Sequence, residues 1–63
     1  MGVTHERSDT YMLQAYIKGI WFDEGTVSKH GASAQCRNSA KKGGVPARVW
    51  NMTKNALYVE ARP

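Results

Sequence analysis

The sequence contains a single cysteine, Cys36, among its 63 residues. One thiol cannot form an intramolecular disulfide, and it excludes the zinc sites that are built from several cysteines. A lone cysteine is typical of a reducing compartment, so we expect a cytoplasmic protein. The first seven residues include no apolar stretch of the kind that forms a signal peptide. No apolar run approaches the ~18 residues of a membrane span, and we expect no membrane partner.

Large aliphatic residues are also scarce, and many candidate core positions are Ala, Val or Cys. A chain of this length lies near the lower limit for a self-sufficient core. Such a thin core predicts modest stability, a homodimer, or a partner that completes the fold. Residues 1–9 are polar and have no periodicity, which predicts a flexible N-terminal tail. We expect residues 10–63 to form one domain.

Acidic residues are few, and most of them lie near the N-terminus. Residues 1–25 have a net charge of −2, whereas residues 26–63 have a net charge of +6. A basic half on a small domain attracts polyanions such as nucleic acid or a nucleoprotein. The alternative, which the charge pattern leaves open, is that these charges only keep the surface soluble.

Alternation of apolar and polar residues begins at Tyr11. The odd positions from Tyr11 to Trp21 are apolar except for Gly19, which predicts one long strand with a single buried face and a bend or bulge at the glycine. Residues 23–25, Asp-Glu-Gly, have the composition of a turn. Residues 26–30 then predict a second strand, although an early start of the helix is the alternative.

A short helix is predicted over residues 34–42. Ser33 is the expected N-cap, and Gly43 and Gly44 end the helix. Within it, Cys36 and Ala40 lie four residues apart, on the face that would contact the sheet.

The same spacing places Arg37 and Lys41 together on a basic stripe, which we regard as a secondary binding face.

The C-terminal segments 45–52 and 56–62 alternate again. Their odd positions are aliphatic and their even positions are aromatic or charged, which predicts a hairpin with one buried face and one binding face. If Trp50 and Tyr58 share the exposed face, the loop needs an odd number of residues. A loop over residues 53–55, with Asn55 in the left-handed conformation, satisfies this condition.

Pro46 cannot donate a ladder hydrogen bond, so we expect its strand at the sheet edge and the last strand nearer the centre.

These elements predict a small α+β fold, with an antiparallel sheet of three to four strands and one short helix packed on one face. The expected core consists of Leu13, Ala15, Ile17, Cys36, Ala40, Val49, Leu57 and Val59.

Catalytic and metal-binding patterns are weak. His5 and His30 have no third ligand of comparable quality, and Asp23 and Glu24 read as turn residues. Cys36 lies on the small-residue helix face, which favours packing over reactivity. We therefore expect no enzyme, no cofactor and no metal.

The predicted binding surface combines aromatic and basic side chains. Such residues can stack on nucleic acid bases, and they are also enriched in protein–protein hot spots, so both partners stay open. The simpler alternative is a cross-strand aromatic pair that only stabilises the hairpin, and an apolar stripe on this face could also form a homodimer. The expected partner-binding residues are Tyr16, Lys18, Arg48, Trp50, Tyr58 and Arg62.

The element order, with a short helix closed by Gly43-Gly44 and a final hairpin ending in Leu57–Glu60, resembles compact α+β anti-CRISPR proteins of phages. The resemblance covers residues 11–62 in element order and size, and no functional residue is carried over from it. It implies a small non-enzymatic protein that inhibits or modulates a host nucleoprotein complex. The basic charge differs from that of acidic DNA mimics. The alternative function is a direct DNA- or RNA-binding regulator, and a small enzyme is a further alternative.

Overall fold

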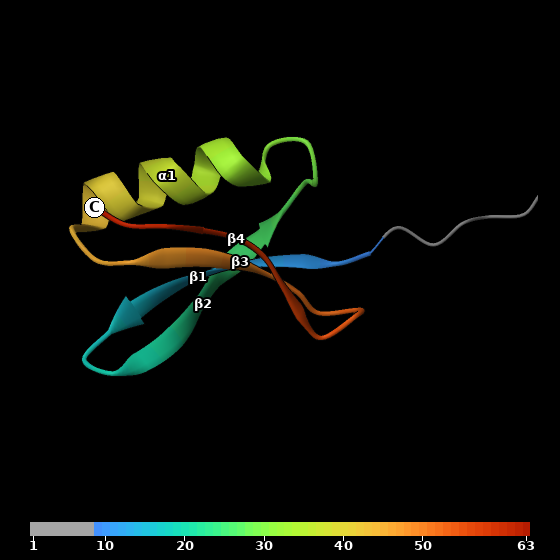
Figure 1. Ribbon diagram of the computed structural model, residues 1–63, viewed down its shortest axis with the longest axis horizontal. Coiled ribbons are helices and arrows are strands. Elements are labelled where there is room, and N and C mark those ends of the chain that lie inside the picture. Colours follow the sequence, from blue (N-terminus) through green and yellow to red (C-terminus); the bar gives the residue numbers. More distant parts are fainter. Residues whose placement is uncertain (1–8) are drawn as a thin grey trace, which may run out of the picture.

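Four antiparallel strands and one helix make up the described part of the chain, residues 9–63, in the computed structural model (Figure 1). The sheet order is β2-β1-β3-β4, and the helix α1 follows β2, which confirms the predicted α+β class. The predicted N-terminal tail lies, apart from Asp9, outside the described residues. The elements are β1 (Tyr11–Ile17), β2 (Ile20–Val27), α1 (Ala32–Gly43), β3 (Ala47–Asn51) and β4 (Ala56–Ala61).

A two-residue turn at Lys18 and Gly19 joins β1 to β2. Their φ angles are +51° and +84°, and two positive values in succession are typical of the type I′ turn, whose twist matches that of the strands. The prediction of one strand from residue 11 to residue 21 is therefore wrong. The chain reverses instead, and Tyr16 pairs with Trp21 across the hairpin.

The predicted turn at residues 23–25 lies inside β2. Leu13 pairs with Gly25 and Gln14 pairs with Asp23, which leaves Glu24 as the extra residue of a β-bulge. Gly25 accommodates the bulge with a φ of +139°. The predicted second strand over residues 26–30 is only the end of this strand, because β2 stops at residue 27 and residues 28–31 form the turn into α1.

Helix α1 begins two residues earlier than predicted. Its N-cap is Gly31, with no side-chain cap, so the expectation for Ser33 is wrong. The C-terminal end is as expected. Gly44 adopts a left-handed conformation (φ +67°), and its N–H donates to the carbonyl oxygen of Ala40 at 2.9 Å.

Strand β3 lies between β1 and β4, and the edges of the sheet are β2 and β4. The prediction that the strand following Pro46 lies at an edge is therefore wrong, as is the prediction of a more central last strand. Pro46 precedes β3 and contributes no ladder N–H to it. Its carbonyl oxygen accepts a hydrogen bond from the Tyr16 N–H at 2.9 Å, which extends the pairing of β1 beyond β3.

The β3–β4 hairpin contains the second bulge of the sheet. Trp50 pairs with Leu57, but Val49 pairs with Val59, so Tyr58 is the extra residue. Its ring lies 4.8 Å from that of Tyr11, between centroids, and Tyr11 belongs to the core cluster on the helix side.

The predicted pairing of Trp50 with Tyr58 on one face is wrong, because the bulge reverses the alternation between them. Leu57 takes the place beside Trp50. The turn spans residues 52–55, and Asn55 has the expected positive φ, +54°.

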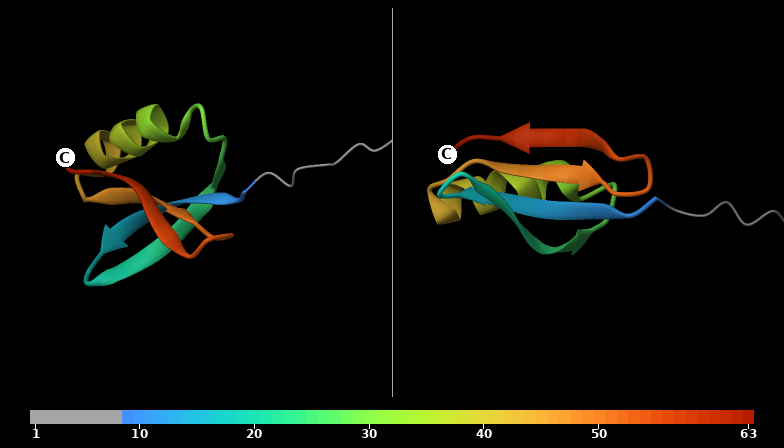
Figure 2. Two further views of the ribbon diagram at one scale, coloured as in Figure 1. Left: turned by 45° about the vertical axis from the view of Figure 1, so that its right-hand side comes forward. Right: turned by 90° about the horizontal axis from the view of Figure 1, so that it is seen from below.

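The core between the sheet and α1 is built from small side chains. Figure 2 shows the helix against one face of the sheet, and it contacts β1, β3 and β4. The largest fully buried side chains are Val49 and Cys36. Two predicted core residues are exposed. Ile17 (40% exposed) lies next to the β1–β2 turn, and Leu57 (51% exposed) lies on the opposite face. The remaining predicted core residues are buried or half-buried: Leu13, Ala15, Cys36, Ala40, Val49 and Val59.

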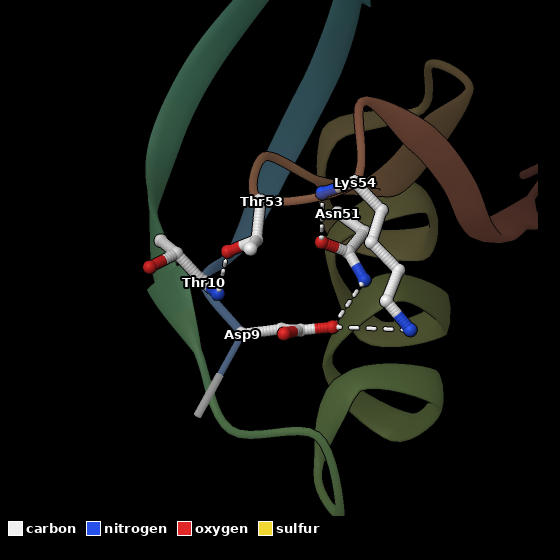
Figure 3. Close-up of polar contacts among 5 residues, drawn as sticks. All are labelled: Asp9, Thr10, Asn51, Thr53 and Lys54. Carbon is white, nitrogen blue, oxygen red and sulfur yellow. Dashed lines mark hydrogen bonds and ion pairs between the residues drawn. The ribbon is translucent and has the colours of Figure 1, made fainter. Parts of the chain in front are cut away.

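A polar cluster fastens the start of β1 to the β3–β4 turn (Figure 3). Asn51, which is buried, donates from Nδ2 to the Asp9 carboxylate at 3.0 Å and accepts from the Lys54 N–H at 3.0 Å. The Thr10 N–H donates to Thr53 Oγ1 at 2.8 Å. Lys54 Nζ also lies 3.7 Å from the same Asp9 oxygen. These contacts hold the hairpin turn against β1.

Candidate functional site

The sheet has one face that none of the described elements covers (Figure 2). Side chains alternate along each strand, so the residues paired with the even positions of β1 lie on the face opposite α1. We call this surface the outer face. It is formed by Met12, Gln14, Tyr16, Trp21, Asp23, Thr26, Arg48, Trp50, Leu57 and Glu60.

Arg48 lies at the centre of the outer face, between two indole rings. Its guanidinium carbon lies 4.1 Å from the centroid of the Trp21 ring and 4.6 Å from that of Trp50. Both distances are within the range of an attractive cation–π contact. The two tryptophans come from β2 and β3, so the arginine links strands that are not neighbours in the sheet.

Two successive hydrogen bonds between side chains hold the Arg48 guanidinium in place. Arg48 Nε donates to Gln14 Oε1 at 2.7 Å, and Gln14 Nε2 donates to Asp23 Oδ1 at 2.8 Å. Gln14 is only 8% exposed, although it lies on a face that no other element covers, because the surrounding large side chains shield it. A shielded amide whose oxygen and nitrogen both form a hydrogen bond favours one fixed arrangement of this cluster.

The outer aromatic rings are also held in place. The Tyr16 and Trp21 rings lie 4.9 Å apart between centroids and are tilted by 52°. Trp50 Nε1 donates to Asn55 Oδ1 at 3.2 Å. Together with the arginine, these contacts form a surface that is already ordered before any partner arrives, which lowers the entropy cost of binding.

The structure brings together three of the six predicted partner-binding residues: Tyr16, Arg48 and Trp50. The other three lie elsewhere. Lys18 is in the β1–β2 turn, Tyr58 lies on the helix side against Tyr11, and Arg62 follows the end of β4.

Trp21 was missed by sequence reasoning, because a single long strand placed it with the core residues. The signal that identifies its true position is Gly19, which follows a polar residue between two apolar runs, as in a two-residue hairpin.

The outer face carries one cation, Arg48, and two carboxylates, Asp23 and Glu60, so it has no excess of positive charge. Arg48 is paired in register with Glu60 on one side, and it is linked through Gln14 to Asp23 on the other. The positive charge of the chain is therefore not concentrated here. The largest group of cations lies in α1 and the turn before it, where the predicted secondary binding residues Arg37 and Lys41 are both exposed.

On the opposite face, an apolar groove lies between the C-terminal end of α1 and the β1–β2 hairpin. It has a volume of about 600 Å³, and its lining includes Ala15, Ile17 and Val45. Two large apolar side chains of the same hairpin, Ile20 and Phe22, are exposed (57% and 46%).

Cys36 is a packing residue in this fold. It is fully buried, and its Sγ donates a long hydrogen bond to the carbonyl oxygen of Val59 at 4.0 Å. Burial raises the pKa of the thiol above its ordinary value, and the negative charge of Glu60 raises it further. A raised pKa reduces the thiolate fraction at neutral pH, which does not favour a nucleophile. Within residues 9–63 there is no group of three His, Cys, Asp or Glu side chains arranged to hold a metal ion.

The helix of the described chain is too short and too polar to cross a membrane. No protein-family model, curated protein or solved structure matches this chain. The surfaces of the protein are therefore the basis for inferring its function.

Proposed function

We propose that this protein is a non-enzymatic binding protein that docks its outer face on a protein subunit of a host nucleoprotein complex and modulates that complex. The resemblance to anti-CRISPR proteins suggests the kind of target, a nucleoprotein machine attacked by a phage or mobile element. Docking by itself requires no turnover, and inhibition follows if the docked protein blocks a working surface of the complex.

The observation that carries the proposal is the arginine held between Trp21 and Trp50. Tryptophan, tyrosine and arginine are the residues most enriched in protein–protein hot spots. Here they are gathered on an uncovered sheet face and are fixed by the Gln14–Asp23 chain. Leu57 adds an exposed aliphatic side chain beside Trp50.

The lack of excess positive charge on this face favours a protein partner over a bare nucleic acid. Nucleic acid affinity comes largely from phosphate neutralisation, which needs an excess of cations. Arg48 is instead flanked by the carboxylates of Asp23 and Glu60. A partner surface with apolar pockets and few charges matches this arrangement better than a polyphosphate does.

The test compares two variants that each replace one exposed aliphatic side chain on opposite faces. Leu57→Gln changes the outer face, and Ile20→Gln changes the hairpin on the helix side. Both purified variants and the wild-type protein are immobilised and exposed to nuclease-treated bacterial lysate, and captured proteins are quantified by mass spectrometry. We expect Leu57→Gln to reduce capture of the specific partner at least tenfold, because it removes apolar contact at the docking surface, while Ile20→Gln changes it less than twofold. The reverse pattern would place docking at the groove and contradict the proposal.

A second copy of the chain is the rival occupant of the outer face. Analytical ultracentrifugation up to ~1 mM distinguishes the two cases, because a functional homodimer should form below that concentration. We expect a monomer. A dimer that Leu57→Gln dissociates would assign the outer face to self-association instead.

A further inference from the structure

Helix α1 carries only basic charges. Its three charged residues are Arg37, Lys41 and Lys42, and no acidic residue lies anywhere in the helix. Lys29, in the turn that precedes the helix, adds a fourth positive charge at the other end. The helix therefore accounts for much of the positive charge of the C-terminal half of the chain.

The packing of α1 determines where these cations lie. Ala32, Cys36 and Ala40 are buried against the sheet, so Ala34 and Asn38 occupy the side of the helix that faces solvent. An α-helix turns by about 100° per residue. Arg37 and Lys41 consequently lie together on one flank of the Ala34–Asn38 line, and Lys42 lies on the other flank. The line between them carries short side chains that allow a close approach.

These cations are not neutralised by neighbouring carboxylates. The salt bridge within residues 9–63 joins Lys54, in the β3–β4 turn, to Asp9, just before β1. Figure 1 shows the β3–β4 turn and the start of β1 at the opposite end of the fold from the C-terminal end of α1. Glu24 lines the same groove as Lys42, yet the two form no ion pair within 4.0 Å. Glu60, on β4, is paired in register with Arg48, and although its charge also acts on Cys36 in α1, it forms no ion pair within 4.0 Å with a cation of the helix. The exposed side of α1 is thus a positively charged surface whose cations form no ion pair within the described residues.

We propose that the exposed surface of α1 binds the sugar–phosphate backbone of a nucleic acid. The surface has no large apolar side chain, so it offers neither the insertion that holds an amphipathic helix in a bilayer nor the anchor residues of a protein hot spot. Its binding energy must come from charge, and phosphate is the ligand that gains most from such a surface. Contacts of this kind position a protein on the backbone without reading its sequence.

The proposal does not depend on the outer face, which lies on the other side of the sheet. A contact between α1 and nucleic acid would be additional to the contact between the outer face and a protein subunit. A protein that docks on a subunit through one face and on the neighbouring nucleic acid through the other suits a nucleoprotein target, but each contact can be lost without the other.

The salt dependence follows if each of the three cations within α1, Arg37, Lys41 and Lys42, contacts one phosphate. The logarithm of the binding constant should fall with the logarithm of salt concentration with a slope of about −2.7 for duplex DNA and about −2 for a single strand. Between 50 and 200 mM salt, the affinity for duplex DNA should thus fall by about 40-fold.

The experiment measures fluorescence anisotropy of labelled 20-nucleotide single-stranded and duplex DNA of arbitrary sequence, titrated with protein from 50 to 200 mM salt. The test variant is Arg37→Gln/Lys41→Gln/Lys42→Gln. The control variant is Lys18→Gln/Lys54→Gln/Arg62→Gln, which removes the same number of positive charges from positions outside α1. All six side chains are exposed, and the ion pair that the control variant loses, Lys54 with Asp9, involves a solvent-exposed lysine, so both variants should keep the fold, which circular dichroism verifies.

We expect the helix variant to bind DNA at least tenfold more weakly at 50 mM salt and to lose most of the salt slope. The control variant should change less than threefold. Equal losses in the two variants would show that only net charge matters and would overturn the assignment to α1. Absence of wild-type binding at ~1 mM protein would also overturn it, as would binding to phosphatidylserine vesicles or to an acidic polypeptide but not to DNA.

Discussion

Arg48→Met is the sharpest perturbation of the outer face, because methionine keeps much of the length of arginine while removing its charge and its donors. Two contacts with the indole rings are lost, each contributing about 0.5–1 kcal/mol. The Gln14 Oε1 acceptor loses its donor in a shielded position, which costs about 1–3 kcal/mol. Methionine packing between the rings offsets part of this loss. We expect a net destabilisation of about 2–3 kcal/mol.

This loss is large for a domain of this size. Single cores below about 70–80 residues rarely supply more than about 3–5 kcal/mol. The urea midpoint should therefore fall by about half or more, and the melting temperature should fall by about 10–20 °C. A stabilising osmolyte keeps the variant folded at the start of the titration.

Tryptophan fluorescence is a direct assay, since the two tryptophans of the chain, Trp21 and Trp50, both contact the arginine. Circular dichroism in parallel tests whether unfolding is two-state. The double variant Gln14→Leu/Arg48→Met should lose less stability than the two single variants together, by at least about 0.5 kcal/mol of unfolding free energy. The reason is that removing both partners leaves no Gln14 oxygen without a donor. A cost below ~0.5 kcal/mol for Arg48→Met would refute the central role of the cluster.

Three further outcomes test the structural account. Lys18→Asn should stabilise the protein by about 0.5–1 kcal/mol in urea unfolding, because asparagine tolerates the left-handed conformation that lysine adopts in the β1–β2 turn; a neutral or destabilising result contradicts the turn assignment. Tyr58→Ala should cost about 0.5–1.5 kcal/mol of stability through the lost contact with Tyr11, yet leave partner capture per folded molecule unchanged; loss of capture in the folded variant would place Tyr58 in the binding surface. The pKa of the Cys36 thiol is raised in the folded state. The protonated thiol therefore contributes stability that is fully present below the ordinary thiol pKa near 9 and is lost as the pH rises through the pKa of the folded state. Urea unfolding between pH 8 and about 10.5 should therefore show a steeper fall in stability for the wild type than for Cys36→Ala, and equal slopes would contradict the raised pKa.

Periodicity predicted the helix side of the fold well. The spacing of Cys36 and Ala40 identified the buried face of α1, and the alternation around Val49 identified the buried face of β3. These assignments succeed because side-chain directions repeat at a fixed period in a helix or an uninterrupted strand, so the apolar residues of one element all indicate the same buried face.

The errors in assigning side chains to the two faces of the sheet share one physical origin, an extra residue or a reversal within a strand pattern. One additional residue moves every following side chain to the other face. The bulge at Tyr58 did so within the run Leu57-Tyr58-Val59, where all three residues favour β-structure and nothing in the composition marks the bulge. The turn at Lys18-Gly19 had the same effect on Trp21, because Lys-Gly is a weaker turn signal than Asn-Gly.

The candidate site was therefore only half predictable. The aromatic and basic residue types that form it were visible in the sequence, whereas the contact between Arg48 and Trp21 depends on the hairpin register. The distribution of charge also required the fold. Only the fold shows that the outer face combines Arg48 with the carboxylates of Asp23 and Glu60, whereas the charged residues of α1 are all basic.

The central claim is that the outer face binds a protein partner. Its most direct test incorporates a photo-crosslinking amino acid at position 57, on the outer face, or at position 38, on the exposed side of α1. Each protein is irradiated in bacterial lysate with and without nuclease. We predict that position 57 forms one dominant protein adduct that survives nuclease, and that position 38 forms an adduct that nuclease removes. A protein adduct of equal yield at both positions, or none at position 57, would contradict the claim.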